Sequence, residues 1–168
     1  MIFGVSGQPL PGGIAYGSEI SQAAAQTNFP PCWLYAHGYQ ETIKVAGWME
    51  TMGKTPANFI SDDGGHGIFQ LTASYPPNWQ VPYANACYAV IQYLMPAIKY
   101  WNSTYGLLGD QLMRCVAAEY NAGRSNAEAG HNHGDVGMFT TKDADGNEYP
   151  DLVMKYYHQL AAGQKPSG

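Results

Sequence analysis

The chain has 168 residues, of which 45% are hydrophobic and 12% are charged, and its formal net charge is −5. This length and hydrophobicity predict one folded domain and exclude a largely disordered chain. The acidic balance, without any run of Lys or Arg, argues against nucleic acid as a partner, because nucleic-acid-binding surfaces gather basic side chains. The most apolar stretch, residues 84–101, is interrupted by Asn85, Gln92, Pro96 and Lys99. No membrane insertion is therefore expected.

The first residues lack the basic patch and apolar stretch of a secretory signal, so none is expected. The three cysteines, Cys32, Cys87 and Cys115, form an odd set without the spacing of metal ligands. We therefore expect reduced, mostly buried thiols rather than a disulfide framework.

The N-terminal part of the chain predicts a lead-in and two helices. Residues 1–17 are rich in Gly and Pro and indicate an extended lead-in to a domain over residues 18–163. Ser18 is a candidate N-cap for a short first helix. Pro30 and Pro31 fit the start of a second helix, where a missing N–H costs nothing. The residues of this helix that recur at spacings of three and four, and so form its inward stripe, are Trp33, Leu34, His37, Glu41 and Val45.

The rest of the chain alternates loops and helices, so the fold class is mainly α. Residues 53–67 are rich in Gly, Asp, Asn and Pro and predict a loop. Residues 83–101 predict a helix with a kink or boundary near Pro96. Another helix follows Gly109 and ends near Gly123, where a second glycine-rich loop is expected. The last predicted elements are a small β-hairpin over residues 139–149 with a turn at Asp145–Gly146, a helix over residues 151–160 and a flexible tail over residues 164–168.

Glu41 is the candidate functional carboxyl group of the second helix. An apolar helix stripe desolvates a carboxylate and raises its pKa toward the range in which it can protonate a leaving oxygen. The alternative from the same pattern is a surface position, or a pairing along the helix with Lys44 or His37.

Two distant polar segments, residues 64–70 and residues 118–123, are suited to meet such an acid. Both combine glycine or alanine with amide and aromatic side chains. This mixture favours contact with a sugar ring over the filling of a dry core. Gly64, Gly65 and Gly67 allow the first segment to approach a ligand closely, although an ordinary flexible turn is the alternative.

The order of these segments resembles that of goose-type lysozymes and soluble lytic transglycosylases, which cleave the glycan strands of peptidoglycan. The family has a catalytic Glu followed by Ser or Thr at the end of a core helix, which Glu41–Thr42 matches. Its Gly-hydrophobic-hydrophobic-Gln motif matches residues 67–70, and its Ala-Tyr-Asn-Ala-Gly motif matches residues 119–123, with Glu119 in place of a small residue. A weaker match is the tyrosine that opens the last helix, here Tyr149.

The resemblance implies a lysozyme-like domain with a substrate cleft and assigns roles to its residues. Glu41 would protonate the glycosidic oxygen, and Tyr149 would steady Glu41 or the intermediate. The residues that the resemblance makes substrate contacts are Gln70, Phe69, Tyr120, Asn121, Tyr149 and His66. No cofactor or metal is implied.

A second carboxylate decides between two reactions that the sequence leaves open. An inverting hydrolase needs a base that activates water, whereas a lytic transglycosylase uses a hydroxyl of its own substrate and one acid. Asp63 is the preferred base and Asp62 the alternative, and both can also be solvated turn residues. Where related sequences often have Asp after the Gln motif, this chain has Leu71–Thr72, and its loop is shorter than the usual goose-type pattern.

Two other classes of function compete with glycan cleavage. His131, His133 and Asp135, with His66 as a further nitrogen, resemble the ligand set of a metallohydrolase. A catalytically silent glycan-binding protein, or a structural virion protein of the same fold, is also open because fold alone does not fix function.

The sequence thus predicts a monomeric enzyme that acts on bacterial peptidoglycan. It is expected in a phage virion, or in the host cytoplasm before release to the cell wall. A bacterial enzyme without its leader would give the same pattern.

Overall fold

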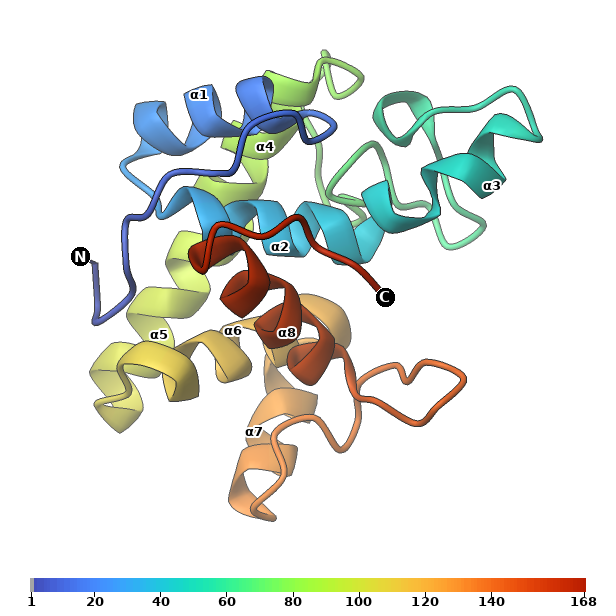
Figure 1. Cartoon of the computed structure of the whole chain (residues 1–168). Coiled ribbons are helices and arrows are strands. Elements are labelled where there is room, and N and C mark those ends of the chain that lie inside the picture. The colour runs from blue at the N-terminus through green and yellow to red at the C-terminus, as the bar shows by residue number, and fades with distance from the viewer. Residues whose placement is uncertain (1) are drawn as a thin grey trace.

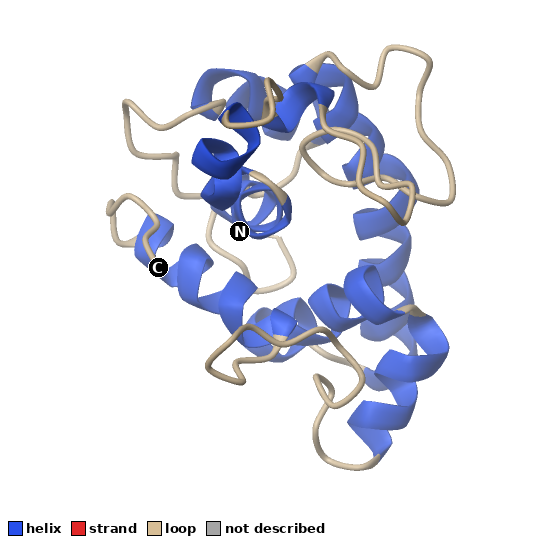
Figure 2. Ribbon diagram, turned by 90° about the vertical axis from the view of Figure 1, so that its right-hand side faces the viewer, coloured by secondary structure: helices blue, strands red, loops and turns tan. Residues whose placement is uncertain are grey.

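The computed structural model describes residues 2–168 and is mainly helical (Figures 1 and 2). The α-helices are α1 (Gly17–Thr27), α2 (Pro31–Glu41), α3 (Ala46–Glu50), α4 (Pro82–Ala89), α5 (Met95–Tyr105), α6 (Gly109–Ala122), α7 (Arg124–Asn132) and α8 (Tyr149–Ala161). Short 3-10 segments cover Ile43–Val45 and Pro56–Asn58, and a π segment covers Val90–Leu94. No helix within residues 2–168 is long and apolar enough to cross a membrane.

Helix α2 lies at the centre of the molecule, where it packs against α1 and α8 (Figure 1). Pro31 is its first residue, as predicted, because a helix start needs no N–H from that position. The buried residues of this helix run without a break over 32–38. A helix buried on all sides cannot show a narrow apolar stripe, so its interior extends beyond the predicted inward face.

The close approach of a loop to α2 favours glycine at position 38, because a larger residue there would have to push its neighbours away. A Cβ atom built on Gly38 would lie 3.1 Å from the ring of Phe69 and 3.1 Å from the side chain of Ile68. Both side chains are fully buried. The loop that carries the Gly-hydrophobic-hydrophobic-Gln motif therefore packs directly on the helix that carries Glu41.

Several helix boundaries differ from those predicted. Helix α1 starts at Gly17 after Tyr16, and Ser18 makes no capping bond. The predicted helix over residues 83–101 is divided by the π segment Val90–Leu94, which precedes Pro96 rather than coinciding with it.

The glycine-rich loop predicted after Gly123 is wrong, because α7 occupies residues 124–132. Gly123 has a φ of 84° and turns the chain between two helices. Its carbonyl oxygen already accepts a bond of 3.0 Å from the backbone N–H of Ala127. One glycine thus ends α6 and precedes the first turn of α7.

The β-hairpin predicted over residues 139–149 is not confirmed, since residues 2–168 contain isolated bridges but no strand. One antiparallel bridge joins Lys142 to Glu148. The turn between them is closed by Asp143, whose carboxylate accepts bonds from the backbone N–H (2.8 Å) and side-chain amide (2.9 Å) of Asn147. Side-chain bonds of Asp143 thus add to the few backbone bonds that join the two sides of this turn, such as the one from the N–H of Asp143 to the oxygen of Asn147 at 3.0 Å.

The cysteines and the C-terminal residues complete the fold. Cys32, Cys87 and Cys115 are free, and the first and third are buried, as predicted. The backbone N–H of Ser167 donates to Gln159 Oε1 at 3.1 Å, so the segment expected to be a flexible tail runs back along α8.

Candidate active site

A pocket of about 860 Å³ lies where the C-terminal end of α2 meets α3, the loop after α3 and the end of α6. Glu41 is the last residue of α2 and is half-buried at this pocket. The other residues that line it are Val45, Trp48, Met49, Met52, Lys54, Asn58, Phe59, Ile60, Ser61, Asp62, Asp63, Gln70, Thr72, Tyr120 and Asn121. The predicted acid, both candidate bases and three predicted substrate contacts are therefore together.

Glu41 has the environment of an acid that holds its proton near neutrality. The pKa of its carboxyl group is raised to about 7, mainly by desolvation and also by the negative charge of Asp63. Two groups act in the other direction. The hydroxyl of Tyr149 donates a bond of 2.6 Å to Glu41 Oε1, and Lys44 contributes a positive charge.

The helical pairings that would make Glu41 an ordinary structural residue are not found. Lys44 Nζ donates to Gln40 Oε1 at 2.8 Å. His37 is fully buried, and neither of its ring nitrogens has a hydrogen-bond partner. Burial lowers the pKa of His37 to about 3, so this ring is neutral and supplies no cation.

Two tyrosines surround the acid from other helices. The ring of His37 packs against Tyr120 at 5.2 Å and Tyr149 at 6.4 Å between centroids. Tyr120, on α6, donates its hydroxyl proton to the backbone oxygen of Phe69, whereas Tyr149, on α8, donates to Glu41. Only Tyr149 of these two thus stabilises the ionised form of Glu41 directly.

The candidate base Asp63 lies in a different environment. Its side chain is exposed and accepts bonds from the Ser61 hydroxyl and, at 3.4 Å, from the backbone N–H of Gly65. These bonds hold the pKa of Asp63 below its usual value. Asp62 is also exposed and also lines the pocket. At neutral pH Asp63 is therefore ionised, whereas Glu41, with a pKa of about 7, still keeps its proton in part of the molecules.

Buried polar side chains fix the loop that carries Gln70. Asn85, on α4, accepts a bond of 3.0 Å from the backbone N–H of Phe69 and donates to the backbone oxygens of His66 (3.1 Å) and Trp79 (3.0 Å). Thr42, next to Glu41, donates to the backbone oxygen of Ile68 at 2.9 Å. Sequence reasoning missed Asn85, for which a polar residue inside an apolar stretch was the available signal.

Gln70 is held at the pocket by an unusual backbone. Its φ of 50° lies in the left-handed region. Its side-chain amide donates to the backbone oxygen of Gly67 at 2.9 Å. The side chain therefore lines the pocket in a fixed orientation.

Phe69 and His66, both predicted to contact substrate, do not line the pocket. Phe69 is fully buried in the core. His66 stacks on Tyr75 at 3.8 Å between centroids, and its Nδ1 lies 2.6 Å from the backbone oxygen of Gly64. Both residues therefore make contacts that hold the loop in place and do not face the pocket.

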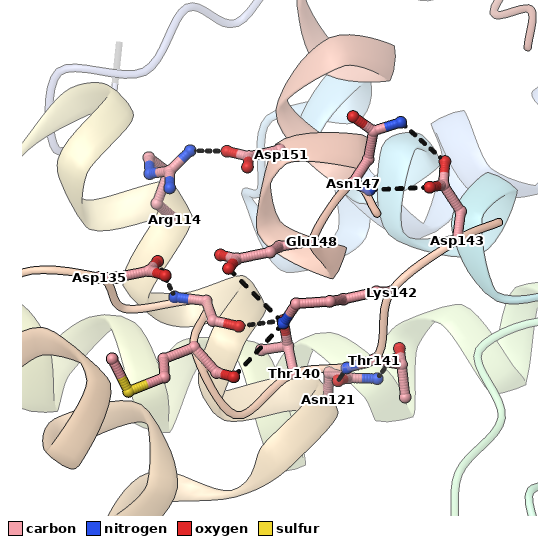
Figure 3. Close-up of polar contacts among 12 residues, drawn as sticks. Arg114, Asn121, Asp135, Thr140, Thr141, Lys142, Asp143, Asn147, Glu148 and Asp151 are labelled. Atoms are coloured by element: carbon pink, nitrogen blue, oxygen red, sulfur yellow. Dashed lines mark hydrogen bonds and ion pairs between the residues drawn. The ribbon is translucent and has the colours of Figure 1, made fainter. Parts of the chain in front are cut away.

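Asn121 faces Thr141 in the segment before α8 (Figure 3). Its side-chain amide donates to Thr141 Oγ1 at 3.1 Å, and its oxygen accepts from the backbone N–H of Thr141 at 2.8 Å. One N–H and one lone pair of this side chain remain for another partner. Tyr149, at the start of α8, is buried and reaches the pocket only through its bond to Glu41.

The pocket has an apolar wall that sequence reasoning also missed. It consists of Trp48 and Met52 near α3 and of Phe59 and Ile60 in the following loop. Trp48 is 56% exposed although it packs edge-to-face against Phe59 at 6.0 Å. Exposed aromatic and aliphatic side chains in a pocket favour contact with an amphipathic ligand.

The residues of the competing metal site do not form a ligand cluster. Across residues 2–168, no group of three or more His, Cys, Asp or Glu side chains is placed to hold a metal ion. His131 instead packs against the rings of Tyr105 at 4.8 Å and Trp101 at 5.6 Å.

Comparisons with known proteins give no assignment. No protein-family model matches the chain, and no curated protein is significantly similar to it.

Proposed function

We propose that the protein cleaves the β-1,4 bond between N-acetylmuramic acid and N-acetylglucosamine in bacterial peptidoglycan, with Glu41 as general acid. The observation that carries the proposal is the half-buried Glu41 carboxyl group, whose pKa is raised to about 7 beside a pocket of about 860 Å³. A pocket of this volume is large enough for sugar rings. The family resemblance of residues 41–42, 67–70 and 119–123 supports the same assignment.

The first step moves the proton of Glu41 to the glycosidic oxygen as the bond from that oxygen to the muramic acid C1 breaks. Positive charge then develops at C1, and the ionised Glu41 and Asp63 stabilise it. The Tyr149 hydroxyl stabilises the new Glu41 carboxylate through its hydrogen bond.

The second step can take two routes, which leave different products. If water attacks C1, Asp63 accepts its proton and the product has a reducing end. If the C6 hydroxyl of the same sugar attacks C1, the Glu41 carboxylate accepts its proton and a 1,6-anhydro end results. The exposed Asp63 carboxylate suits the first route, and the single desolvated acid suits the second.

Mass spectrometry of muropeptides released from purified peptidoglycan tests the proposal. The wild-type protein is expected to release glycan fragments that end in N-acetylmuramic acid, and Glu41→Gln is expected to release about 1,000-fold less. Reducing ends identify the hydrolase and anhydro ends identify the transglycosylase. Binding of the wild-type protein to peptidoglycan without any cleavage would contradict the proposal and favour a catalytically silent glycan-binding or structural virion protein.

A further inference from the structure

A continuous series of hydrogen bonds connects Asn121 to Glu41 through the start of α8. The first bonds join the Asn121 side chain to Thr141, at 3.1 Å to its Oγ1 and 2.8 Å to its backbone N–H. The backbone oxygen of Thr141 accepts a bond of 3.0 Å from the backbone N–H of Tyr149. The Tyr149 hydroxyl completes the series with its bond of 2.6 Å to Glu41 Oε1.

The segment between Thr141 and Tyr149 is built as a stiff turn. The backbone N–H and the side-chain amide of Asn147 both donate to the carboxylate of Asp143. The Nζ of Lys142 lies 3.6 Å from the carboxylate of Glu148 (Figure 3). Glu148 makes no side-chain capping bond at the start of α8. The first N–H of α8 depends on Thr141 for a partner, because the first N–H groups of a helix have none within it.

We propose that Asn121 is a positioning residue, which holds Thr141 so that the Tyr149 hydroxyl stays on the Glu41 carboxyl group and controls its protonation. The side chain of Asn121 thus acts at a distance, through the segment before α8. This inference deepens the proposed function, in which Glu41 is the proton donor, but its structural claim concerns the free protein alone.

The charged and titratable groups around Glu41 come from four elements. They are Tyr149 on α8, Tyr120 on α6, Lys44 after α2, and Asp63 in the loop after α3. The hydroxyl of Tyr120 donates to the backbone oxygen of Phe69, so it does not replace Tyr149 as a donor to Glu41. Loss of the Tyr149 bond therefore removes the hydrogen bond that favours the ionised form of Glu41 and raises its pKa.

Titration of the Glu41 carboxyl carbon by ¹³C NMR in the ligand-free protein tests this inference. Tyr149→Phe is expected to raise the titration midpoint of Glu41 the most, and Asn121→Ala to raise it by about half a pH unit, since the freed segment holds Tyr149 only part of the time. The double variant is expected to match Tyr149→Phe, because both changes break the same series of bonds. An unmoved midpoint in Asn121→Ala, or full additivity in the double variant, would overturn the inference.

Two further variants keep the test independent of folding defects. Thr141→Val retains the shape and backbone of Thr141 but removes its Oγ1, so a smaller rise in the Glu41 midpoint is expected. Asn126→Ala removes a side chain of the same type at an exposed position, where it donates to the backbone oxygen of Ala122 at 2.9 Å, and is expected to leave the midpoint unchanged. A midpoint that moves equally in Asn126→Ala would attribute the effect to general loosening and overturn the inference.

The same experiment separates positioning from substrate contact. If Asn121 acted only on the glycan, Asn121→Ala would raise KM and leave the Glu41 midpoint in the free protein unchanged, which contradicts the inference. Because the titration needs no turnover, its outcome does not depend on whether glycan strands are cleaved.

Discussion

Glu41 and Asp63 line the same pocket but lie in opposite surroundings. Glu41 ends a helix of the core, and desolvation there raises its pKa to about 7. Asp63 is exposed in a glycine-containing loop, where the hydroxyl of Ser61 and the N–H of Gly65 hold its pKa below the usual value. Two carboxyl groups whose pKa values are pushed apart in one site can work as an acid and an ionised partner.

The contrast between the two groups arises from their elements. Helix α2 is buried along residues 32–38. Its last residue, Glu41, therefore lies next to the core, which desolvates one side of the carboxyl group. Asp63 is exposed to solvent, and a hydroxyl and a backbone N–H group of its own loop donate bonds to its negative charge. The fold therefore shifts the pKa values of the two groups in opposite directions before any substrate arrives.

The largest expected effect is on turnover in Glu41→Gln. Loss of the proton donor is expected to reduce cleavage of peptidoglycan by about 1,000-fold, because general acid catalysis typically contributes 10²–10⁴-fold. Sedimentation with cell walls should still show binding. The matched control is Glu50→Gln, on an exposed residue of α3 outside the pocket, which should keep full activity. Equal turnover by both variants would remove the distinction between Glu41 and an ordinary surface acid.

The same substitution should stabilise the fold at high pH. The folded-state pKa of Glu41 is raised from 4.5 to about 7, so its ionisation weakens the folded state as the pH rises through that window. Glu41→Gln removes this cost and should increase the free energy of unfolding by about 2 kcal/mol at pH 8 relative to wild type. At pH 4, urea denaturation should show little of this gain. A gain of the same size at both pH values would mean that ionisation is not its cause.

A smaller effect on activity is expected from a substitution in the apolar wall, which lies in the same pocket but contains neither acid. Trp48→Ala should raise KM for long glycan strands about fivefold, because an aromatic contact contributes about 1 kcal/mol, with little change in kcat. Ile91→Ala is the control, since Ile91 is equally exposed at 56% but lies outside the pocket. A loss confined to kcat would show that Trp48 supports Glu41 rather than the glycan.

The smallest expected effect concerns Asp63 itself. Its negative charge raises the pKa of Glu41, so Asp63→Asn should lower that pKa by a few tenths of a pH unit. ¹³C NMR titration of Glu41 measures the change. Asp62→Asn is the matched control, because Asp63 alone of the two contributes to the pKa of Glu41. An equal change in both variants would mean that only net charge matters.

The central helix and its acid were predictable because their signals are local. Pro31 marks the start of α2, and the spacing of three and four predicted Glu41 on this helix, where it is the last residue and half-buried. The glycine pattern of residues 64–70 likewise predicted a loop against the pocket, where Gln70 lies.

Other features depend on contacts between distant residues, which local patterns do not contain. Asn121 bonds to Thr141 across 20 positions, and Asn85 fixes a loop 16 positions away. Asn121 was predicted only as a substrate contact, because nothing in the local sequence indicates its bonds to Thr141. Helix α7 was missed for a different reason. Gly123 predicts the end of a helix followed by a loop, whereas here a second helix follows it directly.

The most direct test of the account is the pH dependence of kcat/KM on a defined glycan oligomer, since this quantity reports the essential acid of the free protein. If Glu41 is the proton donor, kcat/KM falls tenfold per pH unit above about pH 7, where its carboxyl group loses its proton. A rate that stays constant to pH 9, or that already falls near pH 4.5, would contradict the assignment of Glu41 as a desolvated general acid.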